Sequence, residues 1–237
     1  MREWMANFAD GLDRAKSLED VFGLVLGAAQ ALGFEYCAYG LRLPVPVTRP
    51  RMLTINNYSA TWWARYQEAG YLLRDPTVQH GRRSGLPVIW SDTLFADALD
   101  LWEDARAHGL RVGWARSGFD GHGVGGLLTF ARSCEALTAV ELAHKEVDMH
   151  WMVYAAHLAL TRAVWPALTT RLPIALTPRE IEVLKWAADG KTSFEIAQIL
   201  VVGVDTVKFH TKNAVAKLGV ANRNSAVVYA ALQGLLG

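Results

Sequence analysis

The segment TPREIEVLKWAADGKTSFEIAQILVVGVDTVKFHTKNAVAKLG, residues 177–219, indicates the architecture of the C-terminal part of the chain. It opens with Thr177 as an N-cap, Pro178 at the first helical position and Glu180 three residues after the cap. Threonine and glutamate at this spacing form a capping box, in which each side chain accepts a hydrogen bond from the other residue's backbone N–H. Gly190 then ends the helix, because glycine readily adopts the left-handed conformation found there. These signals predict one short helix with both ends defined.

Three more helices follow directly. The stretch TSFEIAQIL repeats the capping box with Thr192 and Glu195, so a second helix begins there. A three-residue break, VVG, leads into a third helix, and Asn222 caps a fourth in NRNSAVVYAALQGLL. Four short helices with a tight glycine-containing turn between the second and third are typical of a helix-turn-helix domain.

The third helix is predicted to have two different faces. At about 100° per residue, the face that packs on the other helices carries Val207, Thr211, Ala214 and Leu218. The opposite face carries Asp205, Lys208, Phe209 and Lys212, with Asn213 at its edge. In the major groove, lysine contacts phosphate or guanine and asparagine contacts adenine, so this face suits DNA. A solvated charged face on a small helical domain is the alternative.

The preceding residues mix helices and strands. The predicted helices are 17–33, 59–70, 95–108 and 138–168, the last opened by a capping box of Thr138 and Glu141. The predicted strands are 34–43, 51–56, 111–119 and 125–133. This order predicts an α/β N-terminal domain, an α/β/α sandwich on a mainly antiparallel sheet, followed by an all-α four-helix domain. Two prolines near 169–180 place the domains at 1–168 and 176–237, with a linker at 169–175.

Composition excludes several classes of protein. The chain has 237 residues, of which 51% are hydrophobic and 20% charged, as expected for a globular protein with a sizeable core. Its two cysteines, Cys37 and Cys134, form no metal-ligand spacing, so we expect reduced thiols in a cytoplasmic protein with no metal site and no cofactor. The apolar run 151–165 is interrupted by His157 and Arg162 and is shorter than the ~20 residues of a membrane span, so it is expected to be a buried helix.

A second informative segment is NNYSATWWARYQEAGYLLRDPTV, residues 56–78. Tyr58, Trp62 and Tyr66 follow one another at four-residue steps, which place side chains on one face of a helix. An aspartate, Asp75, comes shortly after them. The three aromatic residues are either ordinary core or the wall of a pocket, and aspartate before proline is also an ordinary helix N-cap.

Two quoted stretches carry a resemblance to a known family. LTPREIEVLKWAADGKTSFEIAQIL and TVKFHTKNAVAKLGVANR resemble the output domain of LuxR-type transcription regulators, which implies that 205–218 is the helix that reads DNA. A phosphoacceptor receiver domain needs a lysine late in its sheet pattern, and the only lysines before residue 180, Lys16 and Lys145, lie outside the predicted strands, so such a domain is not expected. The expected DNA-binding residues are Thr192, Thr206, Lys208, Phe209, Lys212, Asn213, Lys217 and Arg223.

The N-terminal part resembles the acyl-homoserine-lactone receptors of the quorum-sensing branch through LGFEYCAYGLR, the YxxxWxxxY spacing, DPTVQHG, VIW and LWEDARAHGL. The resemblance implies that Trp62 donates to the lactone carbonyl and Asp75 accepts from the ligand amide. Tyr58 donates to the amide carbonyl, and Thr129 is a second contact there. Tyr66 and Trp90 pack on the lactone ring and acyl chain, and Trp102 helps to close the lactone end. One acceptor and several donors complement such a ligand, since an unpaired buried polar group costs ~1–3 kcal/mol.

The resulting hypothesis is a ligand-controlled regulator that binds a two-fold symmetric promoter element as a homodimer and contacts RNA polymerase. Dimerisation is expected through 138–168 and 222–236. The alternative is a ligand-independent interaction protein that forms heterodimers with related regulators and silences them. An enzyme such as a lactonase is disfavoured, because the chain has no GxSxG segment and no metal-binding histidine cluster.

Four residues depart from the family pattern. Gly203 stands at the N-cap of the third helix, where a side-chain cap is more usual. Asp205 places a negative charge on the DNA face, where it either accepts from cytosine or repels phosphate. Ala38 and Asn56 are expected to border the pocket, at positions where a hydroxyl is common.

Overall fold

The computed structural model describes residues 3–42, 52–119, 124–168, 175–232 and 234–237, which form two compact units. The first unit contains the described residues up to 168, and the second contains those from 175 onward. The linker predicted at 169–175 falls almost entirely on 169–174, outside the described residues.

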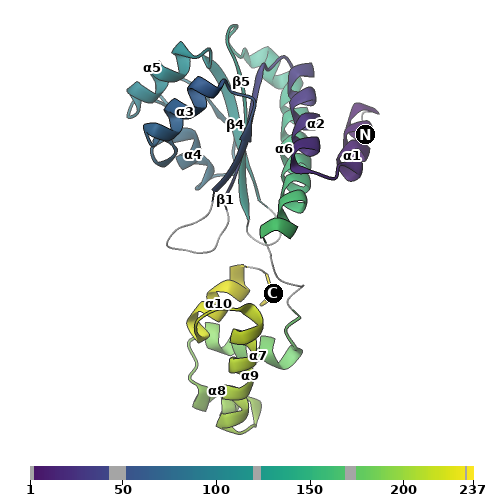
Figure 1. Cartoon of the computed structure of the whole chain (residues 1–237), viewed down its shortest axis with the longest axis vertical. Helices are drawn as coiled ribbons and strands as arrows, with labels where there is room; N and C mark the ends of the chain where they lie inside the picture. Colours follow the sequence, from purple (N-terminus) through teal and green to yellow (C-terminus); the bar gives the residue numbers. More distant parts are fainter. Residues whose placement is uncertain (1–2, 43–51, 120–123, 169–174, 233) are drawn as a thin grey trace. The chain divides into compact units, whose positions relative to one another are not determined.

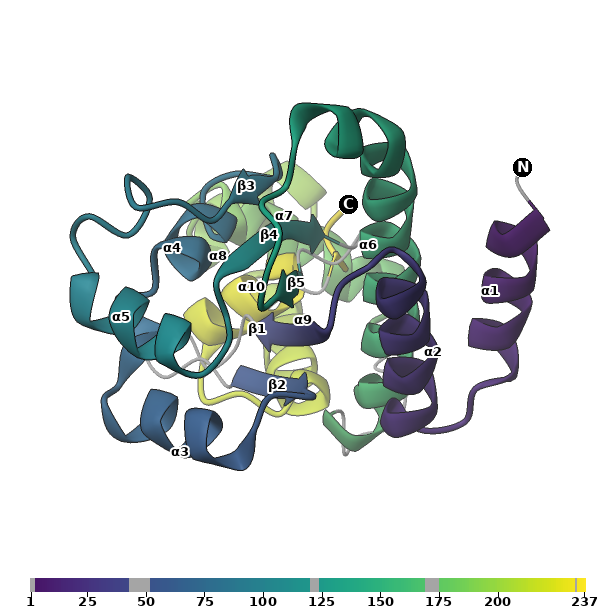
Figure 2. The ribbon, with the colours of Figure 1, turned by 90° about the horizontal axis from the view of Figure 1, so that it is seen from above.

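The N-terminal unit is an α/β/α sandwich, as the sequence predicts (Figure 1). Its antiparallel sheet has the strand order β2-β1-β5-β4-β3. The strands are β1 Tyr36–Arg42, β2 Met52–Asn56, β3 Val88–Ile89, β4 Val112–Phe119 and β5 Gly125–Arg132. One face is covered by α2 Leu18–Ala31 and α6 Ala139–Leu168, with α1 Glu3–Arg14 outside them (Figure 2). The other face carries α3 Ala60–Glu68, η1 Tyr71–Leu73, α4 Pro76–Gly81 and α5 Leu99–Ala107.

Strand alternation gives the two faces of the sheet different side chains. In β1, Cys37, Tyr39 and Leu41 are fully buried in the core with α2 and α6. Ala38 and Gly40 lie between them and therefore face the other side. Because these two residues are small, the sheet leaves room beneath α3 and α4.

The long helix α6 is not wholly buried. The sequence predicts that its apolar run is a buried helix, but Tyr154 is 59% exposed and Leu158 is 41% exposed. His157 is buried, where its Nδ1 lies 2.7 Å from the Tyr39 hydroxyl. The run therefore has one core face and one apolar face that the described residues of this chain leave exposed.

The start of α6 is held by a cluster of charged side chains. The backbone N–H of Glu141 donates to Thr138 Oγ1 at 3.1 Å, as expected of a capping box. The Glu141 carboxylate, however, accepts from both terminal nitrogens of Arg132 and from Lys145 Nζ, at 2.7–2.9 Å. Hydrogen bonds from Arg132, together with a hydrogen bond from Lys145, lower the pKa of Glu141 to about 2.

Replacing Glu141 with glutamine is expected to destabilise the N-terminal unit by up to about 3 kcal/mol at neutral pH, because the nearly buried Arg132 loses its anionic partner. The carboxyl pKa is depressed in the folded state, so its stabilisation is present above the ordinary value near 4.5 and is lost as the pH falls toward 2. Urea midpoints from pH 7 to pH 3 measure this. The variant should show a smaller loss of stability below pH 4.5 than the parent, because the contribution of Glu141 is absent.

Glu146→Gln is the matched control on the same helix, because the exposed carboxylate of Glu146 lies 3.5 Å from His150 in a surface pair. It should change stability by less than ~0.5 kcal/mol. Equal loss in the two variants would contradict a specific role for the Glu141 cluster.

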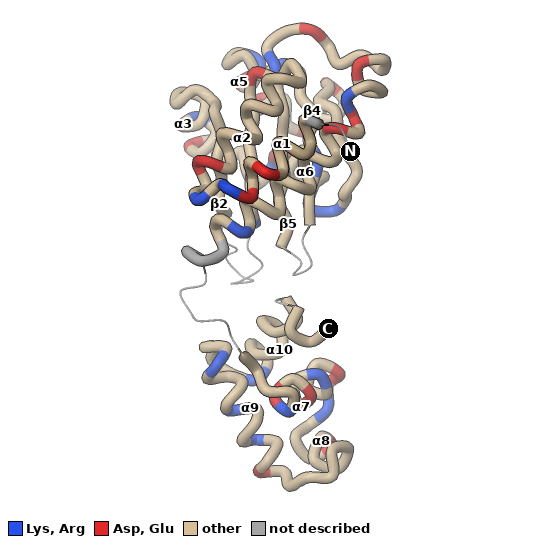
Figure 3. The backbone as a smooth tube through the Cα atoms, turned by 90° about the vertical axis from the view of Figure 1, so that its right-hand side faces the viewer, with Lys and Arg blue, Asp and Glu red and all other residues tan. Residues whose placement is uncertain are grey.

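The C-terminal unit consists of α7 Pro178–Ala188, α8 Ser193–Leu200, α9 Val204–Leu218 and α10 Arg223–Leu232 (Figure 3). Both predicted capping boxes are present, from Thr177 with Glu180 and from Thr192 with Glu195. The N–H of Ser225 donates to Asn222 Oδ1 at 2.9 Å, so the fourth helix is capped as predicted. The turn before α9 differs in one respect: its left-handed residue is Val201, with φ 53°, while Gly203 has φ −70° and serves as the N-cap.

Candidate ligand pocket and DNA interface

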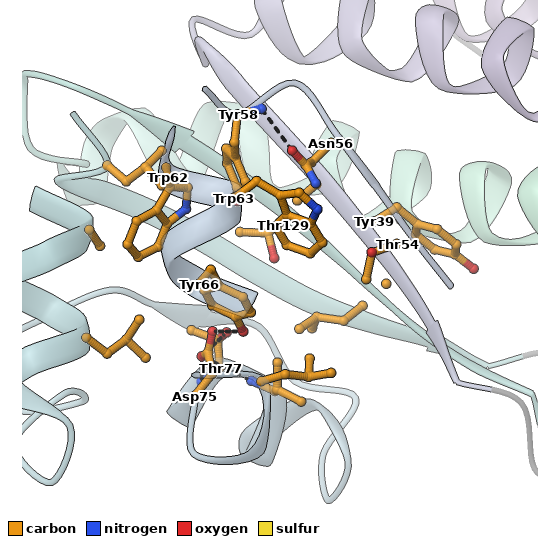
Figure 4. A pocket seen from close by; sticks show the side chains of 18 of the residues that line it. Tyr39, Thr54, Asn56, Tyr58, Trp62, Trp63, Tyr66, Asp75, Thr77 and Thr129 are labelled. Atoms are coloured by element: carbon orange, nitrogen blue, oxygen red, sulfur yellow. Dashed lines mark hydrogen bonds between the residues drawn. The ribbon is translucent and has the colours of Figure 1, made fainter. Parts of the chain in front are cut away.

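A cavity separates α3 and α4 from the sheet (Figure 4). It contains about 700 Å³ of space, counting its opening to solvent. Its floor comes from β1, β2 and β5, and its roof comes mainly from α3, α4 and α5. Six of the seven predicted ligand contacts lie in its wall: Tyr58, Trp62, Tyr66, Asp75, Trp90 and Thr129.

Two of the three aromatic residues are presented by α3. The N-cap Ser59 accepts a hydrogen bond from the backbone of Trp62, which begins the helix at Ala60. Trp62 is buried, and its ring contacts that of Tyr66 edge-on at 5.7 Å. Tyr58 precedes the cap, so the prediction that it lies on this helix is wrong, although its ring still reaches the pocket.

Asp75 serves both as a helix cap and as part of the pocket wall. Its Oδ1 accepts from the backbone N–H of Thr77 at 2.8 Å and from the Thr77 hydroxyl at 2.6 Å, which caps α4. Its Oδ2 accepts from the Tyr66 hydroxyl at 2.9 Å (Figure 4). Burial, and then the nearby Asp75 carboxylate, raises the pKa of Tyr66 well above its ordinary value. Tyr66 therefore keeps its proton and remains a donor at physiological pH.

Tyr58 is held in the protonated form as well. Burial raises the pKa of its phenol far above the ordinary value, and the Asp75 charge adds to the effect. Its backbone N–H donates to Asn56 Oδ1 at 3.0 Å, which fixes the residue at the end of β2. The pocket thus presents phenol donors beside one carboxylate acceptor.

Two tryptophans occupy different positions around the cavity. Trp90 lines it, and its buried indole nitrogen has no hydrogen-bond partner among the described residues. Trp102 is outside the lining: it donates to Asp92 at 2.7 Å and stacks on Phe95, with ring centroids 4.6 Å apart. Phe95 itself lines the cavity, so Trp102 supports the wall from behind.

Several lining residues have no counterpart among the predicted contacts. Ala38 and Asn56 border the pocket as expected, and the further lining residues include Gly40, Thr54, Trp63 and Thr77. The small residues of β1 are visible in the sequence. The position of Thr54 opposite Gly40 depends on the β1–β2 register, which the sequence does not specify.

The outward face of α9 matches its prediction. Val207, Ala214 and Leu218 are buried, and Thr211 is half-buried with its hydroxyl bonded to the Val207 carbonyl. The exposed residues of the opposite face are Asp205, Lys208, Phe209 and Lys212. Thr206 is exposed and Asn213 is partly exposed beside them.

Three other predicted DNA contacts have partners within the unit. Thr192 is exposed while it caps α8, and Arg223 donates to the Lys191 carbonyl. Lys217 Nζ donates to the buried carboxylate of Glu180 at 2.8 Å, which joins α9 to α7. Lys217 thus has a structural partner whether or not it contacts DNA.

Within the part of the chain that the structure describes, no three His, Cys, Asp or Glu side chains gather as a metal site would require. The same residues contain no helix that is both long and apolar enough to span a membrane. Cys37 is buried and Cys134 is exposed, and both are free thiols.

Both units match family models. Residues 17–160 match the autoinducer binding domain, and residues 175–230 match the bacterial regulatory proteins of the luxR family. The transcriptional activator protein SolR of Ralstonia solanacearum is 40% identical over 233 residues, which cover 97% of this chain and 99% of SolR.

Solved structures agree with this assignment. A crystal structure of Escherichia coli SdiA matches with a TM-score of 0.86 at 33% identity, covering 99% of this chain and 98% of that chain. The N-acylhomoserine lactone dependent LuxR family transcription factor CepR2 from Burkholderia cenocepacia matches with a TM-score of 0.62 at 34% identity, covering 68% of this chain and 95% of that chain. The chain therefore belongs to the LuxR family of quorum-sensing regulators, as a ligand-responsive DNA-binding protein with an autoinducer-binding domain and a helix-turn-helix domain.

Proposed function

We propose that the signal is an N-acyl-homoserine lactone that binds between α3, α4 and the sheet. The observation that carries the proposal is the set of donors around one acceptor in an otherwise apolar cavity. Asp75 accepts from the ligand amide, Tyr58 and Trp62 donate to its carbonyls, and Thr129 adds a hydroxyl near the amide. The name of CepR2 as a lactone-dependent factor supports the same ligand class.

The acyl chain would lie over the small residues of β1. Ala38 and Gly40 leave space there, and Val78 and Leu127 supply apolar walls. Each methylene buried in such a channel contributes ~0.8 kcal/mol. Because the ligand binds the folded unit and not the unfolded chain, it stabilises the protein by mass action.

The regulator would act as a homodimer on a two-fold symmetric promoter element. Val140, Val147 and Tyr154 are exposed on α6 at seven-residue intervals, which gives this helix an apolar stripe available to a second copy. Two copies place two α9 helices in successive major grooves of a symmetric site. We assign residues 1–168 to ligand binding and dimerisation, 169–175 to the linker and 176–237 to DNA binding.

The protein would work in the cytoplasm, where the promoter and RNA polymerase are, and would regulate transcription without catalysing a reaction. The alternative is a ligand-independent partner that pairs with related regulators and silences them. Asp205 favours that alternative to the extent that its charge weakens DNA binding.

Production of the full chain with and without a panel of acyl-homoserine lactones tests the proposed ligand. Soluble yield, melting temperature and mass spectrometry of extracted ligand should identify one preferred chain length. If no lactone changes yield or melting, the receptor assignment fails and the heterodimer alternative gains support.

A further inference from the structure

Asp205 is an acid on a face that otherwise suits DNA. It is the second residue of α9, whose N-cap Gly203 makes no side-chain hydrogen bond. The Asp205 side chain is 98% exposed, and its carboxylate lies 3.5 Å from the Nζ of Lys208, whose side chain is 65% exposed. Such an exposed pair holds neither partner firmly. The carboxylate is therefore available to a molecule that docks on α9.

The position of Asp205 determines what it would meet. Together with Lys208, Phe209 and Lys212 it follows the i, i+3, i+4, i+7 spacing of a single helix face. In helix-turn-helix proteins the N-terminal residues of the recognition helix contact the base edges in the major groove. Asp205 lies at the end of α9 that meets the bases.

The major groove offers a carboxylate few favourable partners. Guanine presents only acceptors there, and thymine presents an acceptor and a methyl group, so both repel it or leave it unpaired. Adenine presents a donor beside an acceptor, which suits an amide better than a carboxylate. Cytosine presents its N4 amino group, the natural donor to a carboxylate. Elsewhere on the duplex, phosphates repel the charge.

We propose that Asp205 is a specificity-determining residue that accepts a hydrogen bond from the N4 amino group of a cytosine in each operator half-site, while it weakens binding to other sequences. The inference rests on the proposed DNA-reading role of α9. It assigns the acid to the recognition of cytosine, which the lysines on the same face cannot recognise in this way because they are donors only.

A purely structural role would have a different signature. An acid in the first turn of a helix interacts favourably with the helix dipole and stabilises the helix by ~0.3–1 kcal/mol. Removing it would then lower the melting temperature of the C-terminal unit and leave base preference unchanged. Melting and base preference must therefore be measured on the same variants.

The test uses the full chain saturated with the acyl-homoserine lactone that most raises its melting temperature, and selects duplexes from a random pool with the parent and with Asp205→Ala. The parent should select cytosine at one position of each half-site, and the variant should lose that preference by roughly 5- to 150-fold. Replacing that cytosine with 2-pyrimidinone, which lacks the amino group, should lower the affinity of the parent for the duplex and leave the affinity of the variant unchanged. Affinity of the variant for unrelated duplexes should rise.

Two controls isolate the effect. Lys208→Ala should weaken binding to all duplexes and keep the cytosine preference. Asp189→Asn, which removes an exposed acid outside α9, should alter neither affinity nor preference. An Asp205→Ala variant with the parent's base preference would overturn the inference even if its melting temperature fell. A parent that binds no duplex in any condition would overturn the DNA-reading role itself.

Discussion

Replacement of Asp75 with asparagine is expected to raise the lactone concentration for half-maximal response by roughly 10- to 100-fold, because a charge-assisted hydrogen bond contributes about 1.5–3 kcal/mol. Asparagine is an equally good helix cap, so α4 should still begin at Pro76. The variant keeps its shape but offers the ligand amide a weaker acceptor. The shift in melting temperature against lactone concentration measures the loss.

Asp104→Asn is the matched control for this experiment. Asp104 accepts from the Tyr71 hydroxyl at 2.5 Å and from Arg65 Nε at 2.7 Å, yet it lies outside the pocket lining. Its replacement should lower the melting temperature without altering the lactone concentration needed for response. If Asp75→Asn and Trp62→Phe both retained the parent's sensitivity, the head group would be placed wrongly.

The second large effect concerns Lys217. Replacing it with alanine leaves Glu180, which is 3% exposed, as a buried charge without its cation. Burial opposes ionisation of Glu180, but hydrogen bonds from Lys217 and from Thr177 outweigh it and keep the carboxyl pKa below the ordinary value. Loss of a buried pair costs several kcal/mol, and with Lys217 39% exposed we expect about 2 kcal/mol. Thermal unfolding of the C-terminal unit should begin roughly 10 °C lower.

Two variants separate this structural effect from DNA contact. Glu180→Gln combined with Lys217→Met leaves no charge unpaired, and glutamine retains the capping box, so stability should largely return. Lys212→Ala removes an exposed cation and should reduce operator affinity and its salt dependence with unchanged melting. A Lys217→Ala variant with normal stability and weak DNA binding would show that Lys217 acts on DNA alone.

The C-terminal unit was predictable because its signals are local. Each capping box lies within four residues, so Thr177 and Thr192 define two helix starts without tertiary information. The pairing of Lys217 with Glu180 joins residues 37 apart, and no local pattern indicates it. The left-handed turn at Val201 was missed because a β-branched residue rarely adopts that conformation.

The pocket was predictable only in part, for a related reason. The spacing of the aromatic residues in 58–66 indicated one wall of the pocket. The resemblance to acyl-homoserine-lactone receptors indicated that Asp75 and Trp90 contact the ligand. The floor of the pocket depends on how β1 pairs with β2 and β5. Trp102 lies outside the pocket lining, and its indole N–H donates to Asp92. Helix α1 and the two-residue strand β3 were not predicted, and a strand of two residues is too short to show an alternating pattern.

Ligand in the N-terminal unit is expected to control DNA binding by the C-terminal unit. Fluorescence anisotropy of one labelled operator duplex, titrated with the full chain at fixed salt, measures it directly. We predict at least a tenfold higher affinity with the preferred lactone than without it, and no such gain for Asp75→Asn. Equal affinity with and without lactone, in a protein that mass spectrometry shows to carry the lactone only when it is added, would mean that the ligand does not control DNA binding.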